Sequence, residues 1–123
     1  MNRTILVIAE LRDGVLRRVS LEAVGAARTL AGEDGTVTAY VAGANPDAHA
    51  HLLLAAGADR VHTAERPPGE PYNAERAFRE AAALYKRLRP AAVVLGHTAA
   101  GKDWAPRLAA LTDAGQVSDV IAI

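Results

Sequence analysis

The sequence predicts an α/β fold in which helices cover both faces of a parallel sheet. Short runs of β-branched and aliphatic residues alternate with longer, alanine-rich segments of helical periodicity. The first run, Thr4–Ala9, is apolar on both faces, as in strands that helices bury from both sides. With 123 residues, 50% of them hydrophobic, the chain can bury a core of its own. We therefore expect one domain over residues 1–123, a three-layer, Rossmann-like parallel sheet with the order βαβαβαβαβ.

The predicted strands are short and end at turn-forming residues. After the first strand, Asp13-Gly14 favours a tight turn and predicts a small hairpin between Leu11 and Val15. The remaining strands are expected at Thr36–Ala42, Arg60–Thr63, Ala92–Leu95 and Gln116–Ile123. Because domains seldom end on a core strand, we expect a fragment of a longer protein, truncated after its fifth strand.

Four helices fill the intervals between these strands. Ser20 is expected to cap the first helix, and its core face to carry Leu21, Val24, Ala27 and Leu30. Asn45-Pro46 begins the second helix and Asn73 caps the third. The fourth is expected to begin at Asp103, with Pro106 in its first turn, where a missing N–H costs little.

Composition excludes several classes of function. Fourteen basic residues balance fourteen acidic ones, whereas a surface that tracks nucleic-acid phosphates needs a basic excess. There is no cysteine, which removes disulfides and thiol catalysis. No apolar run approaches the ~20 residues of a membrane span, and no signal peptide precedes the first strand. We expect a soluble, cytoplasmic protein that neither binds nucleic acid nor inserts into a membrane.

The segment Gly96–Lys102 has the GxxxxGK spacing of a phosphate-binding P-loop and is predicted to join a strand to a helix. A P-loop continues with a Ser or Thr that holds magnesium, but Asp103 stands there, and an acid repels phosphate. A looser nucleotide site remains possible, with Gly96, Thr98, Gly101 and Lys102 as its candidate residues. The alternative is that the glycines only make the turn and Asp103 only caps the helix.

Three other residues are candidates for a site. Glu10 follows the first strand, at the carboxyl edge where α/β folds place ligands, and could bind a ribose or a partner or simply be solvated. His97 has no serine, cysteine or carboxylate in triad spacing, so a catalytic role is the weakest of the hypotheses. Trp104, the only tryptophan, suits either an interface anchor or burial beneath the sheet edge.

The order of motifs resembles that of one known family. VVLGHTAAGKD at 93–103 runs into APRLAAL at 105–111, and this resembles the strand, glycine loop and following helix of electron transfer flavoprotein alpha subunits. The likeness continues in Ile5–Glu10 with Asp13-Gly14, the helix Leu21–Ala31, Gly57-Ala58-Asp59 with Val61, and Gln116–Val120. It covers essentially the whole chain, in order.

The resemblance implies the N-terminal domain of such a subunit, with strand order 3-2-1-4-5. It implies a heterodimer with a beta subunit that carries electrons from acyl-CoA or other dehydrogenases to a membrane quinone oxidoreductase and the respiratory chain. The family's FAD is held mainly by a C-terminal domain that this chain lacks. We therefore expect no FAD on this fragment, no catalytic residues, no metal site, and a role as scaffold and subunit contact rather than as an enzyme. Glu10 and the Gly96–Lys102 loop would flank one crevice between the first and fourth strands.

One alternative has the same fold class. The chain could be a self-standing module that binds AMP or ATP, similar to universal stress proteins or ATP-pyrophosphatase domains. Asp103 at the phosphate end and the lack of a second phosphate loop count against it.

Overall fold

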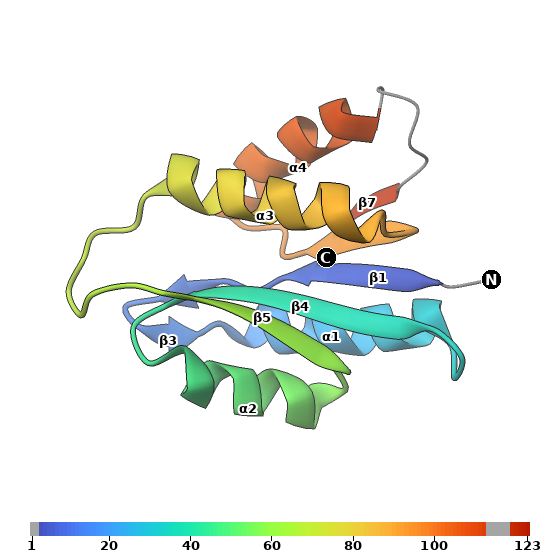
Figure 1. Cartoon of the computed structure of the whole chain (residues 1–123), viewed down its shortest axis with the longest axis horizontal. Helices are drawn as coiled ribbons and strands as arrows, with labels where there is room; N and C mark the ends of the chain where they lie inside the picture. The colour runs from blue at the N-terminus through green and yellow to red at the C-terminus, as the bar shows by residue number, and fades with distance from the viewer. Residues whose placement is uncertain (1–2, 113–118) are drawn as a thin grey trace.

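A five-stranded parallel sheet forms the centre of the molecule (Figure 1). The computed structural model describes residues 3–112 and 119–123. Within them the sheet has the order β5-β4-β1-β6-β7, with strands β1 (Thr4–Ile8), β4 (Thr36–Gly43), β5 (Arg60–Glu65), β6 (Ala92–Leu95) and β7 (Asp119–Ala122). This confirms the expected α/β fold and its 3-2-1-4-5 order. Predicted residues 116–118 of the last strand lie outside the described part of the chain.

Two helices cover each face of the sheet. Helices α1 (Arg18–Ala31) and α2 (Pro46–Ala56) lie on one side, and α3 (Ala74–Leu88) and α4 (Ala99–Thr112) lie on the other (Figure 1). The strands are apolar on both faces and therefore supply two cores. One core joins β1, β4 and β6 to α1 and α2, and the other joins the same strands to α3 and α4. The second core carries the site described below.

The predicted hairpin is present directly after β1. Strand β2 (Leu11–Arg12) pairs with β3 (Val15–Leu16) in antiparallel fashion. Asp13 and Gly14 between them both have positive φ, 53° and 78°, as a two-residue hairpin turn of this kind requires. The hairpin therefore projects at the carboxyl edge of the sheet.

The first helix begins earlier than predicted. It starts at Arg18, so Ser20 is not its cap; Ser20 is buried, and its Oγ accepts the Glu10 N–H at 2.8 Å. Its buried face is Ser20, Ala23, Val24, Ala27 and Ala31, whereas Leu21 is only partly buried and Leu30 is exposed. Small residues on this face let the helix lie close to the sheet. The apolar pattern alone did not predict that small residues, rather than the leucines, form the buried face.

The other helix starts agree with the prediction in part. Asn73 caps α3, because its Oδ1 accepts the Arg76 N–H at 3.0 Å. Helix α2 begins at Pro46 as predicted, but the Asn45 side chain makes no capping hydrogen bond. The Asn45 backbone is left-handed, with φ of 55°, whereas a capping residue normally has extended geometry.

The largest correction concerns the fourth helix. It begins at Ala99 rather than Asp103, so the predicted loop Gly96–Lys102 shrinks to Gly96–Thr98. Two alanines, the best helix formers, start the added turn. Asp103 and Pro106 consequently lie inside the helix, where Pro106 leaves one backbone carbonyl without its usual donor. Among the described residues, no helix is long and apolar enough to cross a membrane.

Candidate functional site

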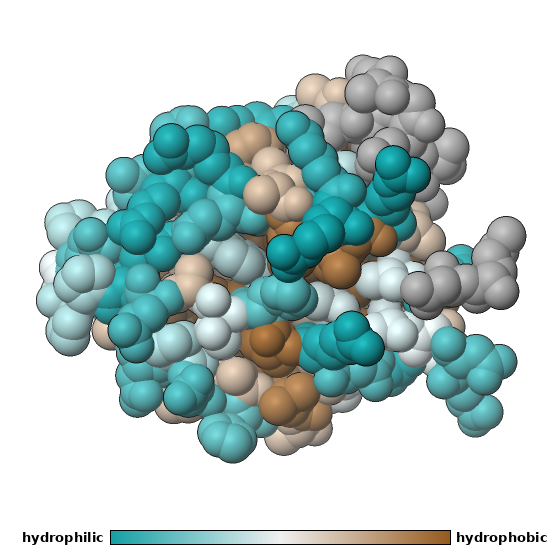
Figure 2. Space-filling model, viewed as in Figure 1, coloured by the Kyte–Doolittle hydropathy of each residue, from teal (hydrophilic) through white to brown (hydrophobic). Residues whose placement is uncertain are grey.

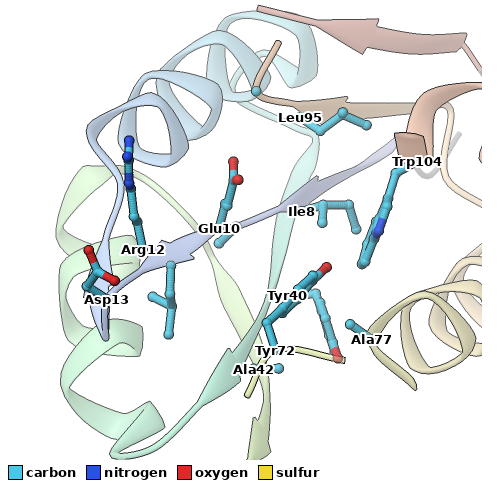
Figure 3. A pocket seen from close by; sticks show the side chains of 13 residues that line it. Ile8, Glu10, Arg12, Asp13, Tyr40, Ala42, Tyr72, Ala77, Leu95 and Trp104 are labelled. Atoms are coloured by element: carbon cyan, nitrogen blue, oxygen red, sulfur yellow. The ribbon is translucent and has the colours of Figure 1, made fainter. Parts of the chain in front are cut away.

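A cavity of about 320 Å³ opens at the carboxyl edge of the sheet, beside the strand at which the chain reverses its direction of winding (Figure 3). Its walls come from the ends of β1, β4 and β6, the β2–β3 hairpin, the connection before α3, and helices α3 and α4. The edge where α/β folds bind ligands therefore carries a space of ligand size.

Three large side chains from three adjacent strands form the floor of the cavity. Ile8 on β1 pairs in register with Tyr40 on β4 and with Leu95 on β6. Residues in register share one face of a sheet, so the three stand in a row toward α3 and α4. All three are buried and belong to the same core. The floor is rigid because every member is fixed by a central strand.

Trp104 forms the wall on the α4 side. Its ring meets Phe78 of α3 edge-on, with centroids 5.8 Å apart and planes at 88°. The Arg107 guanidinium lies 3.9 Å above the same Phe78 ring and pairs with Glu75 at 3.1 Å. These contacts lock α4 to α3. The Trp104 indole is 4% exposed, and its Nε1 is a buried donor without a hydrogen-bond partner.

Tyr72 closes the cavity from the side of the connection between β5 and α3. The residue as a whole is 67% exposed, but Figure 3 shows its ring entering the space beside Tyr40 and Trp104. Burial of its hydroxyl raises the Tyr72 pKa, and the negative charge of Glu10 adds to this effect. The indole N–H of Trp104 opposes the rise, although the two groups do not reach hydrogen-bond geometry. Tyr72 is the most exposed of the three aromatic side chains that line the cavity in the described part of the chain.

Glu10 supplies the carboxylate of the site. Its Oε2 accepts the Thr98 hydroxyl at 2.8 Å, and its Oε1 lies 3.8 Å from Arg17 Nη1. Its backbone is anchored to α1, because its N–H donates to Ser20 and its carbonyl accepts the Arg17 N–H at 2.9 Å. The carboxylate is therefore held at the cavity rather than free in solvent.

An ion pair stiffens the far end of the floor. The Tyr40 hydroxyl donates to Glu80 Oε1 at 3.2 Å, and Arg66 donates to the same carboxylate. Burial, with Glu80 nearby, raises the pKa of Tyr40 to about 12. Burial of Glu80 would raise its own pKa, but the hydrogen bond and charge of Arg66, the hydrogen bond from Tyr40 and the charge of Arg76 together outweigh this, and the net shift is downward. Tyr40 is therefore a neutral donor fixed to α3.

The lining is apolar with a small excess of negative charge. Two acids, Glu10 and Asp13, and one base, Arg12, line it, and no other charged residue lines this cavity in the described part of the chain. Such a space suits a planar or apolar group better than a phosphate. No cluster of three or more His, Asp or Glu side chains that could hold a metal ion occurs among the described residues.

A family model described as "Electron transfer flavoprotein domain" matches residues 5–123. The chain belongs to the electron transfer flavoprotein family. It is 40% identical over 121 residues to the electron transfer flavoprotein subunit alpha of Bacillus subtilis, covering 98% of this chain and 37% of that protein.

Other relatives give the same result. The alpha subunit of Mycobacterium tuberculosis is 38% identical over 95% of this chain and 36% of its own length. That of Thermoanaerobacterium thermosaccharolyticum is 33% identical over 95% of this chain and 36% of its own. The chain thus spans about a third of the length of the curated alpha subunits that it matches.

In this member of the electron transfer flavoprotein family, the predicted loop residues are only partly brought together. Glu10 and Thr98 meet directly, as expected of residues that flank one crevice. Gly96 lines the cavity, but a Cβ there would lie 2.8 Å from Val19 Cγ1, so packing on α1 accounts for this glycine. Gly101 and Lys102 lie in the first turn of α4.

Of the two remaining candidates, Trp104 lies in the site and His97 lies outside the cavity lining. Trp104 is buried beneath the sheet edge rather than displayed as an interface anchor. His97 is exposed, and its backbone N–H donates to the Ile123 carbonyl. Tyr40 and Tyr72 were not anticipated as site residues. In the sequence Tyr40 is one residue of a predicted strand, with nothing to mark it as part of a site. The position of Tyr72 depends on how the proline-rich connection before α3 folds back over the sheet.

Proposed function

We propose that residues 1–123 are one N-terminal domain of an electron transfer flavoprotein alpha subunit, acting as scaffold and subunit contact. The observation that carries this is the family match over residues 5–123, together with alpha subunits about three times as long that align to nearly all of this chain. The rest of the subunit would follow this domain and hold FAD, so the fragment itself would bind none.

The whole complex would be a cytoplasmic heterodimer with a beta subunit. It would take electrons from acyl-CoA or other dehydrogenases and deliver them to a membrane quinone oxidoreductase of the respiratory chain. The domain would carry no reaction itself. Its part would be to hold the partner and the FAD-bearing region in fixed relation, which suits a sheet buried on both faces.

Exposed apolar side chains support a contact role. Leu52 and Leu54 on α2 are 51% and 44% exposed, and Leu30 on α1 is also exposed. Figure 2 shows brown, hydrophobic residues over β5 and α2, and others nearer α3, among hydrophilic ones. Apolar groups gathered on a surface are a common feature of protein interfaces.

The test is direct binding to a beta subunit. The purified chain and an electron transfer flavoprotein beta subunit are mixed and analysed by size-exclusion chromatography with light scattering. Co-elution as a heterodimer is expected, with the full-length Bacillus subtilis alpha subunit as positive control. Separate elution of this chain, under conditions in which the control binds, would contradict the contact role.

The cavity at the carboxyl edge favours a second candidate, a module that binds AMP or ATP through Gly96, Thr98, Gly101, Lys102 and Glu10. Melting temperatures with FAD, AMP and ATP separate the two. A ligand at a hundred times its Kd adds about 2.7 kcal/mol to the free energy of unfolding, which is readily seen. We expect no shift of that size with any of the three; a rise of that size with AMP or ATP would favour the nucleotide module instead.

A further inference from the structure

We propose that the cavity between Trp104, Tyr72 and Glu10 is a binding site for an uncharged nucleoside, which it accepts in preference to the corresponding nucleotide. The base would lie between the aromatic walls and the sugar would face Glu10.

The shape of the cavity favours a planar ring. The floor is the rigid row of Tyr40, Ile8 and Leu95, and the walls are the Trp104 indole and the Tyr72 ring (Figure 3). Aromatic walls stack on the faces of bases without requiring a particular base. The volume of about 320 Å³ is at the small end of the range for ligand pockets, so a compact heterocycle fits better than a large cofactor.

The Trp104 Nε1 calls for an acceptor. A buried N–H without a partner costs about 1–3 kcal/mol, and a ring nitrogen or carbonyl at the edge of a base would remove that cost. The N–H is closed off from solvent, so a ligand reaches it only when a wall moves. Tyr72 is 67% exposed while Tyr40 and Trp104 are buried, so we expect Tyr72 to be the wall that an entering ligand displaces.

Glu10 suits hydroxyl groups. An ionised carboxylate offers about four lone-pair sites; Thr98 uses one on Oε2, and Arg17 Nη1 lies 3.8 Å from Oε1, so sites remain for hydroxyl donors. In Figure 3 Glu10 and Trp104 lie on either side of Ile8, which separates a hydroxyl-binding end of the cavity from a base-binding end. This polarity matches a sugar joined to a base.

The surrounding charges disfavour a phosphate. A second cavity, of about 560 Å³, shares Leu11, Asp13, Ala42, Tyr72 and Ala77 with the first, so the two adjoin. Its acids are Asp13 and Glu70, the latter 3.7 Å from Arg76, and its one base, Arg66, is paired with Glu80. Among the described residues, the two cavities together are lined by three acids, Glu10, Asp13 and Glu70, and by two bases, Arg12 and Arg66, so the lining carries a small excess of negative charge. An excess of like charge weakens the binding of a phosphate.

Trp104 makes the test simple, because it is the only tryptophan and lies in the proposed site. The whole chain is titrated with adenosine and, separately, with AMP, and tryptophan fluorescence is recorded. We expect a saturable change with adenosine and an affinity for AMP at least about tenfold weaker. Raising the salt concentration should strengthen AMP binding by screening the repulsion and leave adenosine binding unchanged.

Two variants locate the effect. Glu10→Gln should reduce the difference in affinity between adenosine and AMP. The matched control Glu22→Gln, at an exposed acid on α1, should leave this difference unchanged. Trp104→Phe keeps a ring at the wall but removes the N–H, and calorimetry should show adenosine binding about tenfold weaker. Circular dichroism of each variant verifies that it is folded.

The unmodified chain alone can overturn the proposal. Equal or tighter binding of AMP would show a phosphate-accepting site, and no fluorescence change with adenosine up to its solubility limit would show that the cavity is not a nucleoside site. Unchanged adenosine affinity in folded Trp104→Phe would remove the indole from recognition and contradict the assigned pose.

Discussion

At the scale of single residues, two side-chain polar atoms in the core beside the cavity are buried without a hydrogen-bond partner, as far as the described residues go. They are the Trp104 Nε1 and the Tyr85 hydroxyl. The two differ in position, because Trp104 lines the cavity, whereas Tyr85 is fully buried and is not among the residues that line it. A ligand can therefore satisfy the first donor but has no access to the second.

Tyr85→Phe should stabilise the fold. It removes the unsatisfied hydroxyl and keeps the ring, so we expect the free energy of unfolding to rise by up to about 1 kcal/mol. Urea denaturation followed by circular dichroism measures this. A loss of more than about 1 kcal/mol would mean that the hydroxyl has a partner, for example a buried water.

Two glycines should respond in opposite directions to the same substitution. Gly25 is exposed on α1 with open space where a Cβ would project, so Gly25→Ala should stabilise by about 0.5–1 kcal/mol. At Gly96 the new Cβ would press on Val19, so Gly96→Ala should destabilise by about 1–3 kcal/mol. Thermal unfolding of the pair tests this. Equal effects would show that Val19 yields freely and that packing does not explain Gly96.

At the scale of elements, one arginine joins the end of α1 to the sheet. Arg28 donates to Asp59 Oδ2 and to the carbonyls of Gly32 and Gly35, each at 2.7 Å. Asp59 in turn accepts the Val37 N–H of β4 at 2.8 Å. The helix end, the turn after it and the approach to β5 therefore meet at one ion pair.

This ion pair should make the free energy of unfolding depend on pH. The Val37 N–H, and then the Arg28 guanidinium, hold the Asp59 pKa below its ordinary 3.8. A lowered folded-state pKa stabilises the protein above pH 3.8, and this contribution is lost as the pH falls through the folded-state value. Asp59→Ala should cost about 2 kcal/mol at neutral pH, since it leaves the buried Val37 N–H unpaired.

Asp59→Asn is the matched variant. It keeps an acceptor for Val37 but loses the charge, and because the side chain is 45% exposed we expect only about 1 kcal/mol of loss. Urea unfolding at a series of pH values should show the difference from the unmodified chain shrinking in acid. A difference independent of pH would remove Asp59 ionisation from the explanation.

At the scale of the whole molecule, patterns that repeat along the chain were predictable and contacts between distant segments were not. Two-sided apolar runs such as Thr4–Ala9 predicted a parallel sheet, and Asp13-Gly14 predicted the hairpin. The start of α4 was mispredicted because Asp103 and Pro106 are typical of a first turn, although Ala99 and Ala100 begin the helix earlier. The cavity depends on Tyr72 meeting Trp104 across the sheet edge, which no local pattern encodes.

The proposal that another part of the subunit holds FAD also gives a prediction for this chain. If FAD belongs to the part of the subunit absent here, the purified chain should lack visible flavin absorbance, and dialysis with FAD should leave none bound. The Bacillus subtilis alpha subunit with its beta partner is the control. Stoichiometric FAD retained by this chain alone would overturn the assignment of the cofactor to another domain.

The row formed by Tyr40, Ile8 and Leu95 makes the cavity depend on the register of three strands. A strand displaced by a single residue turns all of its side chains to the opposite face. If β4 or β6 were out of step with β1, a different side chain would replace Tyr40 or Leu95 beneath the cavity. If the cavity binds a nucleoside as proposed, the bound fraction of refolded protein would measure the fraction of molecules in which these three strands are in register.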